Sequence, residues 1–254
     1  GVVLQIQPLR QVRKYGVSDD LRRSIRVDDD RSVVSCGKLK KPLPYPMMEV
    51  DLLLFEPVIG VAMLATEPDL RRACRPFGEN CGFTIAEGGQ FAVLLDDALA
   101  VELGAMILGA VTDVQVHADG YKKSISSPGV GNYVSFARAV ARAMRDVGED
   151  SIRRRSFVQA HGTGTPQNRT TESQILSGVA KAFGIEDWPV AAIKCFVGHT
   201  MAAAGGDQLA STLGVFAHGI LPGITTIDEV ATDVVQAHLR ISPRPLQRAA
   251  ADWD

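Results

Sequence analysis

The sequence predicts an α/β fold in which helices pack on a sheet. Segments typical of strands and segments typical of helices alternate from residue 88 onward. Each expected helix stops at a glycine, which is the residue that best accepts the backbone conformation at a helix end. In addition, 46% of the 254 residues are hydrophobic and 22% are charged, a composition typical of a globular chain that can bury a sizeable core.

The first part of the chain differs in texture from the rest. Residues 1–48 mix charges of both signs and carry three prolines within residues 42–46, which oppose a helix there. We expect residues 1–48 to form an irregular arm or loop and residues 49–254 to form a partial domain. Position 1 is Gly rather than Met. The chain is therefore expected to be processed or cut out of something longer.

The expected elements of the domain follow in order. Apolar and β-branched runs predict strands, and spacing of apolar residues at three and four positions predicts helices. The expected strands are residues 88–97, 105–119, 156–162, 189–196 and a last one at 234–242. The expected helices are residues 132–148, 171–184 with a Thr or Ser cap, and 200–219.

Charge and composition exclude several function classes. Lys and Arg number 27 and Asp and Glu number 29, so no basic surplus points to nucleic acid or to an anionic membrane. Aromatic residues are only 6% of the chain, too few for a stacking platform. The most apolar stretch is interrupted by Glu56 and Pro57, so it is not a membrane span. Four scattered cysteines do not form a disulfide scaffold, and a reducing, cytoplasmic setting fits them best.

Two of the five histidines occupy matching positions. His161 in "AHGTGTP" and His199 in "VGHT" each follow an apolar run and stand where the chain turns through glycine. In α/β sheets, sites form at the carboxyl ends of the strands. Two adjacent strands would therefore bring both imidazoles into one cleft, where small neighbouring residues leave room for a substrate.

The same two histidines also fit less specific roles. A lone histidine at such a place is more often an ordinary turn or core residue, although two at matching turns favour function. The glycines also suggest a phosphate cradle, but "HGTGTP" lacks the Lys-Ser/Thr ending of a phosphate-binding loop. A metal site needs three or four ligands, and no third ligand has a suitable spacing. We therefore expect no metal.

The motifs resemble those of a known family. "AHGTGTP" followed by a Glu, and then a Lys before "GHT" and "AAG", resemble the β-ketoacyl-acyl carrier protein synthases. Upstream, "CRPFGENCGFTIAEGGQFAVLLDD" resembles that family's segment of the form RPFD-x-x-RDGF-x-x-xEG, and "ADGYKKSISSPGVGN" resembles its variable loop. "HGTGTPQNRTTES" and "GDQL" resemble the bacterial branch that starts fatty acid synthesis. The resemblance covers Leu52 to the end.

The resemblance implies roles for single residues. His161 and His199 would be the two N–H donors that stabilise the enolate formed when a malonyl thioester loses carbon dioxide. Lys194 would hold the hydrogen-bond network of the site, and Glu172 would be its buried acidic partner. Thr163, Thr165 and Gly198 would support these residues within the two motifs. Without the motif, Lys194 would be interpreted as a surface residue at a strand end.

The resemblance also implies a fold and partners. The family has a thiolase-like layered α-β-α-β-α architecture, of which this sequence holds mostly the C-terminal half. Substrates would be carried on the phosphopantetheine of an acyl carrier protein, so no further cofactor is expected. Family members pair their sheets edge to edge, which implies a homodimer or pairing with a synthase subunit.

Two parts of the family pattern are missing. Cys36, Cys74 and Cys81 do not stand in the context of the family's nucleophilic cysteine. Cys195 follows Lys194, whose ammonium is expected to lower the pKa of the thiol, but it is expected to lie in a strand. None of the four is therefore expected to be the nucleophile, and the closing Gly-rich hairpin of the form GFGG-x-NA is missing too. Gly78 also replaces the Asp of the upstream motif.

Three interpretations follow from the motifs and the departures. The first is an enzyme, part of an acyltransferase that catalyses decarboxylative condensation of an acyl thioester with a malonyl-carrier protein. The second is a non-catalytic partner of the chain-length-factor type, although such a partner would not need both histidines. The third is an inactive fragment. A thiolase is a poorer match, because the "HGTGTP" context is peculiar to the carrier-protein synthases.

Overall fold

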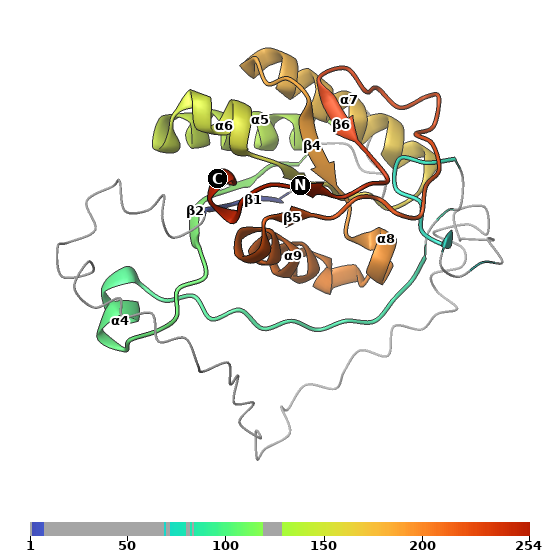
Figure 1. Cartoon of the computed structure of the whole chain (residues 1–254). Helices are drawn as coiled ribbons and strands as arrows, with labels where there is room; N and C mark the ends of the chain where they lie inside the picture. Colours follow the sequence, from blue (N-terminus) through green and yellow to red (C-terminus); the bar gives the residue numbers. More distant parts are fainter. Residues whose placement is uncertain (1, 8–68, 70–71, 80–81, 83, 119–128) are drawn as a thin grey trace.

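A computed structural model of the chain describes residues 2–7, 69, 72–79, 82, 84–118 and 129–254. Helices lie on both sides of a parallel sheet, as the sequence predicts (Figure 1). Helices α5 (Val130–Val147), α6 (Glu149–Arg155) and α7 (Pro166–Phe183) lie on one side, and α9 (Ala204–His218) lies on the other. The described part of the chain is therefore an α/β structure with a three-layer centre.

The central sheet places the site. Strand β4 (Trp188–Ala191) lies in its middle, parallel to β3 (Val158–Gln159) on one side and to β6 (Leu239–Ile241) on the other. Val158 is in register with Val190. All four residues of β4 are buried, which is typical of a parallel strand covered by helices on both faces. Because β3 and β4 are parallel neighbours, their carboxyl ends lie at the same edge of the sheet.

The helices on the first side begin and end where the local sequence requires. Helix α7 starts at Pro166, which fits the first helical position because its missing N–H would have no partner there. The side chain of Thr165 caps this end, and Gly184 ends the helix in the left-handed conformation with φ 65°. Helix α5 ends at Gly148, as predicted.

Two clusters of buried side chains hold the layers together. In the larger one, the ring of Trp188 stacks on Phe136 with centroids 5.4 Å apart, and the indole N–H donates to Ser156 Oγ at 2.8 Å. In the smaller one, Trp253 is completely buried and meets the ring of Phe157 edge-on at 5.2 Å. Burial of a large aromatic side chain of this kind stabilises the fold, by about 1.5–3 kcal/mol for a Phe.

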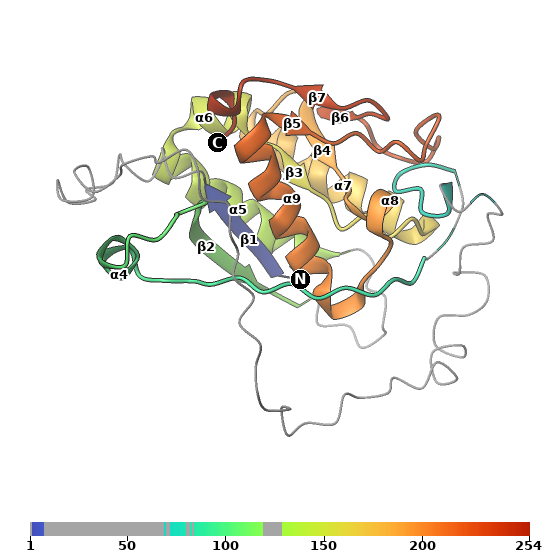
Figure 2. The ribbon, with the colours of Figure 1, turned by 60° about the horizontal axis from the view of Figure 1, so that its bottom comes forward.

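The remaining elements lie around this centre. Strand β1 (Val2–Gln7) pairs antiparallel with β2 (Ala110–Val116), and both strands lie beside α5 (Figure 2). Strand β5 (Ile220–Leu221) pairs antiparallel with β7 (Leu246–Gln247). The short helices are α4 (Asp97–Glu102), α8 (Lys194–Val197), and the 3₁₀ helices η4 (Met201–Ala203) and η5 (Ala250–Asp252).

The prediction of an irregular arm over residues 1–48 is wrong for its first residues. Residues 2–7 form β1, because their apolar, β-branched sequence VVLQIQ finds a partner in β2. Residues 8–48 and the boundary at residue 49 lie outside the described residues. The division into an arm and a domain therefore stays a prediction.

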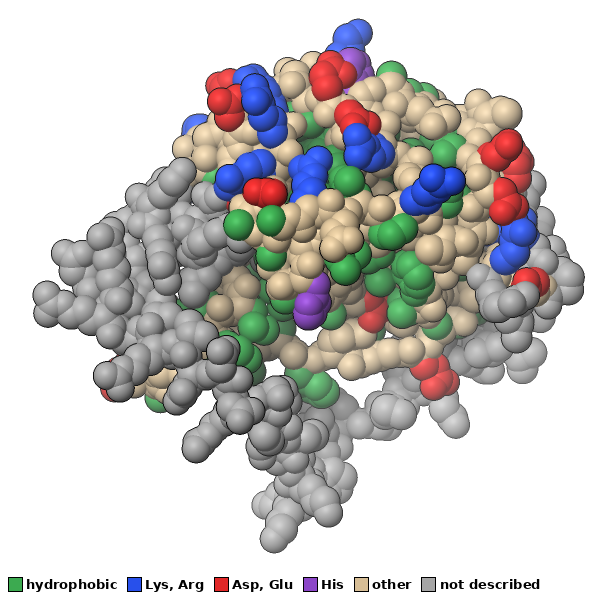
Figure 3. Space-filling view, in the orientation of Figure 1, with side chains coloured by type: hydrophobic (Ala, Val, Ile, Leu, Met, Phe, Trp, Pro, Cys, Tyr) green, Lys and Arg blue, Asp and Glu red, His purple; other side chains and the backbone are tan. Residues whose placement is uncertain are grey.

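The prediction of a strand over residues 88–97 is also wrong. Residues 88–96 run extended but belong to no sheet in the described part of the chain, and α4 begins at Asp97. A strand needs a neighbour to pair its N–H and C=O groups, and no described strand lies beside this segment. Its side chains are exposed accordingly: Phe91 is 98% exposed and Val93 is 82% exposed. Figure 3 shows hydrophobic side chains on the lower surface, where the extended segment and α4 lie.

The boundaries of other elements also differ from the prediction. The expected strand over 189–196 ends at Ala191, and Lys194–Val197 form α8 instead. The helix expected at 171–184 begins earlier, at Pro166. The strand expected to be the last, over 234–242, contains β6 but is followed by β7. Boundaries of this kind depend on caps and pairing partners that periodicity alone does not specify.

Candidate active site

The two histidines lie side by side at the carboxyl edge of the sheet. His161 follows β3, and His199 follows β4 and α8. Their ring centroids are 5.3 Å apart, and the rings meet edge-to-face at 82°. The prediction that matching strand-end turns bring both imidazoles together is confirmed.

Charged groups on both sides hold the main chain at His161. The carboxylate of Glu172, on α7, accepts hydrogen bonds from the backbone N–H of His161 at 2.6 Å and of Gly162 at 2.9 Å. The ammonium of Lys194 donates to the carbonyl oxygen of His161 at 2.6 Å. Burial raises the pKa of Glu172, while the two N–H donors oppose that rise. The predicted partners Glu172 and Lys194 thus meet at one peptide segment.

Lys194 is a core residue rather than a surface residue. It is 1% exposed and begins α8, and its ammonium reaches the main chain of His161. Burial lowers the pKa of its ammonium, and the negative charge of Glu172 is the largest influence that opposes the lowering, followed by Cys74 and Asp207. A buried ammonium in this surrounding is a fixed electrostatic element of the site.

The ring of His199 is held in one orientation. Its Nδ1 accepts a hydrogen bond from the backbone N–H of Met201 at 3.0 Å. A nitrogen that accepts carries no proton, so in the neutral ring the proton is on Nε2. The main chain of His199 donates to Thr84 O at 2.7 Å and accepts from Ala86 N at 3.0 Å. Backbone contacts from the upstream segment, residues 84–86, therefore fix the position of His199, whose ring has an N–H donor at Nε2.

Both imidazoles are neutral near pH 7. Desolvation by burial, followed by the positive charge of Lys194, lowers the pKa of His199 to about 4. Desolvation, Lys194 and then His199 lower the pKa of His161 to about 4. His161 is also partly exposed to solvent, and contact with water opposes the lowering of its pKa. Neutral rings can donate a hydrogen bond to a developing negative charge without carrying a charge of their own.

The predicted supporting residues Thr163, Thr165 and Gly198 fix the backbone near the two histidines. Thr163 and Thr165 are buried, and their hydroxyl groups lie 2.9 Å apart. Thr165 caps α7, and Thr163 N–H donates to Asn168 Oδ1 at 3.0 Å, so the two residues fix the helix that carries Glu172. Gly198 has φ 71°, and a Cβ there would lie 2.9 Å from Ala86 Cβ. Only glycine allows the close approach of these two segments.

The described cysteines do not have the surroundings of a nucleophile. Cys195 lies on α8 rather than in a strand, is 8% exposed, and burial raises its pKa to about 12. The expected lowering by the adjacent Lys194 is wrong, because successive side chains on a helix point about 100° apart and burial dominates. Cys74 is also buried. Cys36 and Cys81 lie outside the described residues.

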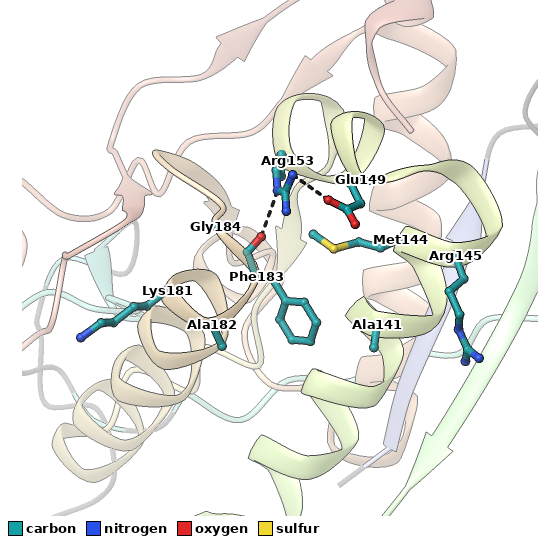
Figure 4. A pocket seen from close by; sticks show the side chains of 9 residues that line it. All are labelled: Ala141, Met144, Arg145, Glu149, Arg153, Lys181, Ala182, Phe183 and Gly184. Carbon is teal, nitrogen blue, oxygen red and sulfur yellow. Dashed lines mark hydrogen bonds and ion pairs between the residues drawn. The ribbon is translucent and has the colours of Figure 1, made fainter.

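A concave pocket of about 550 Å³ lies elsewhere in the fold. Side chains from α5, α6 and the end of α7, among them Met144, Arg153 and Phe183, line it (Figure 4). It adjoins Gly184, whereas Glu172 and Thr165 lie toward the start of α7, which is about 27 Å long at 1.5 Å per residue. The pocket is therefore separate from the histidines.

Two polar residues complete the site, and the sequence analysis quoted them within "GDQL" without giving either a role there. Gln208, on α9, donates to the carbonyl oxygen of Ala160 at 2.7 Å, just before His161. Asp207 accepts a hydrogen bond from the hydroxyl of Thr200, just after His199. The available signal was an Asp-Gln pair within a helix whose other residues, apart from His218 at its end, are small or apolar.

The described residues contain neither a cluster typical of a metal centre nor a helix typical of a membrane span. No group of three or more His, Cys, Asp or Glu residues among them is arranged to hold a metal ion. None of the helices in the described ranges is long and apolar enough to cross a membrane.

Comparison with known proteins identifies the part of the chain that carries the site. Residues 108–228, which contain both histidines, match the family described as "Beta-ketoacyl synthase, C-terminal domain". This part of the chain is a β-ketoacyl synthase C-terminal domain. The chain is 62% identical over 180 residues to beta-ketoacyl-[acyl-carrier-protein] synthase FabY of Pseudomonas aeruginosa, covering 71% of this chain and 28% of that protein. The expected resemblance to bacterial synthases is confirmed.

Solved structures agree with this assignment. The crystal structure of the ketosynthase FabY from P. aeruginosa superimposes with a TM-score of 0.72 and 56% identity, covering 76% of this chain and 32% of that one. The ishigamide ketosynthase/chain length factor superimposes with a TM-score of 0.58 and 26% identity, covering 72% and 42%. The β-ketoacyl synthase domain thus has the thiolase-like α/β fold. The chain spans about a third or less of the length of the FabY relative.

Proposed function

We propose that this chain belongs to an acyltransferase that condenses an acyl thioester with malonyl-acyl carrier protein in fatty acid synthesis. The observation that carries the proposal is the pair of neutral imidazoles at the carboxyl edge of the sheet. Their ring centroids are 5.3 Å apart, and His199 keeps its proton on Nε2. Two such N–H donors fit the single oxygen on which charge develops when a malonyl thioester loses carbon dioxide.

The reaction has a defined role for each of these groups. The bond between the carboxylate and the α-carbon of the malonyl group breaks, carbon dioxide leaves, and the electron pair forms an enolate. The N–H groups of His161 and His199 donate to the enolate oxygen. The enolate carbon then attacks the carbonyl carbon of an acyl group held on a cysteine, and that cysteine leaves as thiolate. Lys194 and Glu172 keep the main chain of His161 in place throughout.

The proposal extends to partners and setting. The name of the FabY relative includes the acyl carrier protein, so we propose the same kind of partner here, with the substrate carried on its phosphopantetheine and no further cofactor. We also propose a cytoplasmic protein that forms a homodimer or pairs with a synthase subunit. Exposed apolar side chains such as Phe91 and Val93 support pairing. Sedimentation of the chain as a monomer at micromolar concentration would contradict it.

The catalytic interpretation is preferred over a chain-length-factor-like partner or an inactive fragment. A subunit that only shapes a pocket has no need of two neutral imidazoles with a fixed ring proton. Here the orientation of His199 is set by Met201 N–H and by the contacts with Thr84 and Ala86. So many specific contacts to a single residue favour a chemical role.

Release of carbon dioxide from malonyl-acyl carrier protein tests the proposal. His161→Ala and His199→Ala should each reduce the rate about 10²–10³-fold, the typical loss on removing one donor to a developing oxyanion. His218→Ala, which changes an exposed histidine at the end of α9, is the matched control and should leave the rate unchanged. Mass spectrometry should find no acyl adduct on Cys74 or Cys195. Decarboxylation that survives both histidine changes, or a stable adduct on either thiol, would overturn the proposal.

A further inference from the structure

A carboxylate on α9 joins two segments that surround His199. Asp207, in the first turn of the helix, accepts a hydrogen bond from the Thr200 hydroxyl on one oxygen and from the Gln90 side-chain amide on the other. Thr200 is 6% exposed. Gln90 lies on the upstream segment, far away in the sequence. One side chain therefore connects the turn after His199 with the segment that packs against it.

The turn after His199 needs such support. Thr200 stands between His199 and Met201, and Met201 has φ 55°, a conformation that residues other than glycine rarely adopt. This conformation lets the Met201 N–H reach back to His199 Nδ1 at 3.0 Å. If the turn relaxed, this N–H would move away, and Nδ1 would no longer be kept free of a proton. Anchoring Thr200 in the middle of the turn opposes that relaxation.

The Gln90 side of the connection has its own structural requirement. The same upstream segment binds the main chain of His199 through Thr84 and Ala86. Gly206 precedes Asp207, and a Cβ at Gly206 would lie 2.5 Å from Gln90 Oε1 and 2.9 Å from Gln90 Cβ. The missing side chain at Gly206 therefore leaves the space through which Gln90 reaches Asp207.

We propose that Asp207 is a positioning residue that holds the turn after His199 in the conformation that places the ring proton on Nε2. It acts through Thr200 on one side and Gln90 on the other, rather than on the substrate. The inference rests on the proposed function for its effect on catalysis, since that function needs an N–H donor at Nε2. Its structural content, the position of the ring proton, is independent of any activity.

The test combines nuclear magnetic resonance with kinetics on the full 254-residue chain labelled with ¹⁵N-histidine. Above pH 7, the two ¹⁵N shifts of His199 report which ring nitrogen carries the proton. Asp207→Ala should move these shifts from the Nε2–H form toward a mixture of both tautomers. It should lower kcat for malonyl-carrier decarboxylation about 10- to 100-fold, the range expected when a catalytic group is misplaced, with KM little changed. Asp207→Asn keeps an oxygen acceptor and an amide that can meet Gln90, so both readouts should stay close to those of the unaltered chain.

Two further variants keep the test decisive. Gly206→Ala pushes Gln90 away from Asp207 without changing the carboxylate, so it should shift the His199 tautomer in the same direction as Asp207→Ala. Asp146→Ala removes a carboxylate that pairs with Arg142 on α5, and this matched control should leave the tautomer unchanged. If Asp207→Ala fails to fold, Gly206→Ala decides.

The failures of the two proposals are distinguishable. An unchanged Nε2–H tautomer in folded Asp207→Ala, or in folded Gly206→Ala when the Asp207→Ala variant does not fold, would overturn the positioning role. An unaltered chain that does not decarboxylate malonyl-carrier protein would instead count against the proposed function. In that case the ¹⁵N comparison would still test the role of Asp207.

Discussion

Two apolar stretches of this chain have similar side chains and opposite surroundings. Strand β4 lies between β3 and β6, and all four of its residues are buried. Residues 88–96 also carry Phe91, Val93 and Leu94, but these are 98%, 82% and 75% exposed. The difference lies in the neighbours: β4 has a paired strand on each side, whereas the extended segment belongs to no sheet in the described residues.

The comparison separates two contributions to a strand. An apolar, β-branched sequence supplies the tendency to be buried, while burial itself requires other strands and helices at the same place. The site depends on the second contribution. His161 and His199 come together because β3 and β4 are parallel neighbours. The following predictions test how far the two stretches differ.

The largest expected effect is on the free energy of unfolding of the chain. Trp188→Ala in β4 should reduce it by about 3–5 kcal/mol, because a large cavity opens and the hydrogen bond to Ser156 is lost. Phe91→Ala in the extended segment should change it by less than about 0.5 kcal/mol, as for other exposed positions. Urea unfolding followed by circular dichroism measures both. Equal losses for the two variants would mean that the extended segment is packed in solution.

The second effect concerns the pH dependence of stability in the site region. The folded pKa of His199 is lowered to about 4 from its ordinary value of 6.5, so the unfolded chain binds more protons between these pH values. The contribution of His199 to stability is therefore present above pH 6.5 and is lost as pH falls toward 4. This loss should be on the order of 2 kcal/mol after the partial access of solvent is allowed for.

The difference between the unaltered chain and His199→Gln gives this contribution together with the coupling to His161, whose pKa the charge of His199 also lowers. Glu172 and Lys194 also have shifted pKa values, but both residues remain in the two chains being compared. Urea unfolding at several pH values between neutrality and the lowered pKa of His199 should show a smaller fall in stability for His199→Gln. Parallel curves for the two chains over this range would show that His199 is not desolvated in the folded state.

The last comparison concerns two glycines that both have positive φ. Gly198 near His199 has φ 71°, and Gly104 after α4 has φ 60°. A Cβ at Gly198 would lie 2.9 Å from Ala86 Cβ, whereas nothing lies within 4 Å at Gly104. Gly198 also has ψ −166°, a backbone conformation that is essentially confined to glycine. Gly104→Ala should cost roughly 1–2 kcal/mol through its positive φ, and Gly198→Ala should cost about 1–3 kcal/mol more through crowding and the more strained backbone.

Thermal unfolding of the two variants gives this difference directly. Subtracting the loss at Gly104 from the loss at Gly198 leaves the extra backbone strain at Gly198 together with the packing between residues 84–86 and the His199 turn. An equal loss in both variants would indicate that the contact between Gly198 and Ala86 is looser than the structure shows.

Local sequence signals predicted much of the fold and, within the site, the two histidines. Apolar periodicity and stopping glycines correctly placed α5, α7 and α9 and four of the strands, because those signals act within one element. The matching turns correctly placed His161 and His199 next to each other. Lys194 and Glu172 were assigned by resemblance, and the structure places both at the main chain of His161; their part in catalysis stays a prediction.

The errors arose where distant segments decide the outcome. The pairing of Val2–Gln7 with β2, and the lack of a described partner for residues 88–96, depend on contacts between remote parts of the chain. The thiol of Cys195 was expected to respond to its neighbour in sequence, but burial in the fold determines its pKa. Asp207 was part of the quoted "GDQL" motif but received no role, because its two partners, Thr200 and Gln90, become neighbours only in three dimensions.

The way in which the main chain is held at His161 has a consequence for molecular recognition. Glu172 binds the N–H groups of residues 161 and 162, and Lys194 binds the carbonyl oxygen of residue 161. The backbone here is already ordered, and the freedom left to the imidazole is rotation about its two side-chain bonds. Immobilising one such side chain costs roughly 0.5–1.5 kcal/mol, whereas ordering a mobile loop costs roughly 1–2 kcal/mol for every residue. A thioester arriving at this ring therefore meets a surface whose conformational entropy was largely lost during folding.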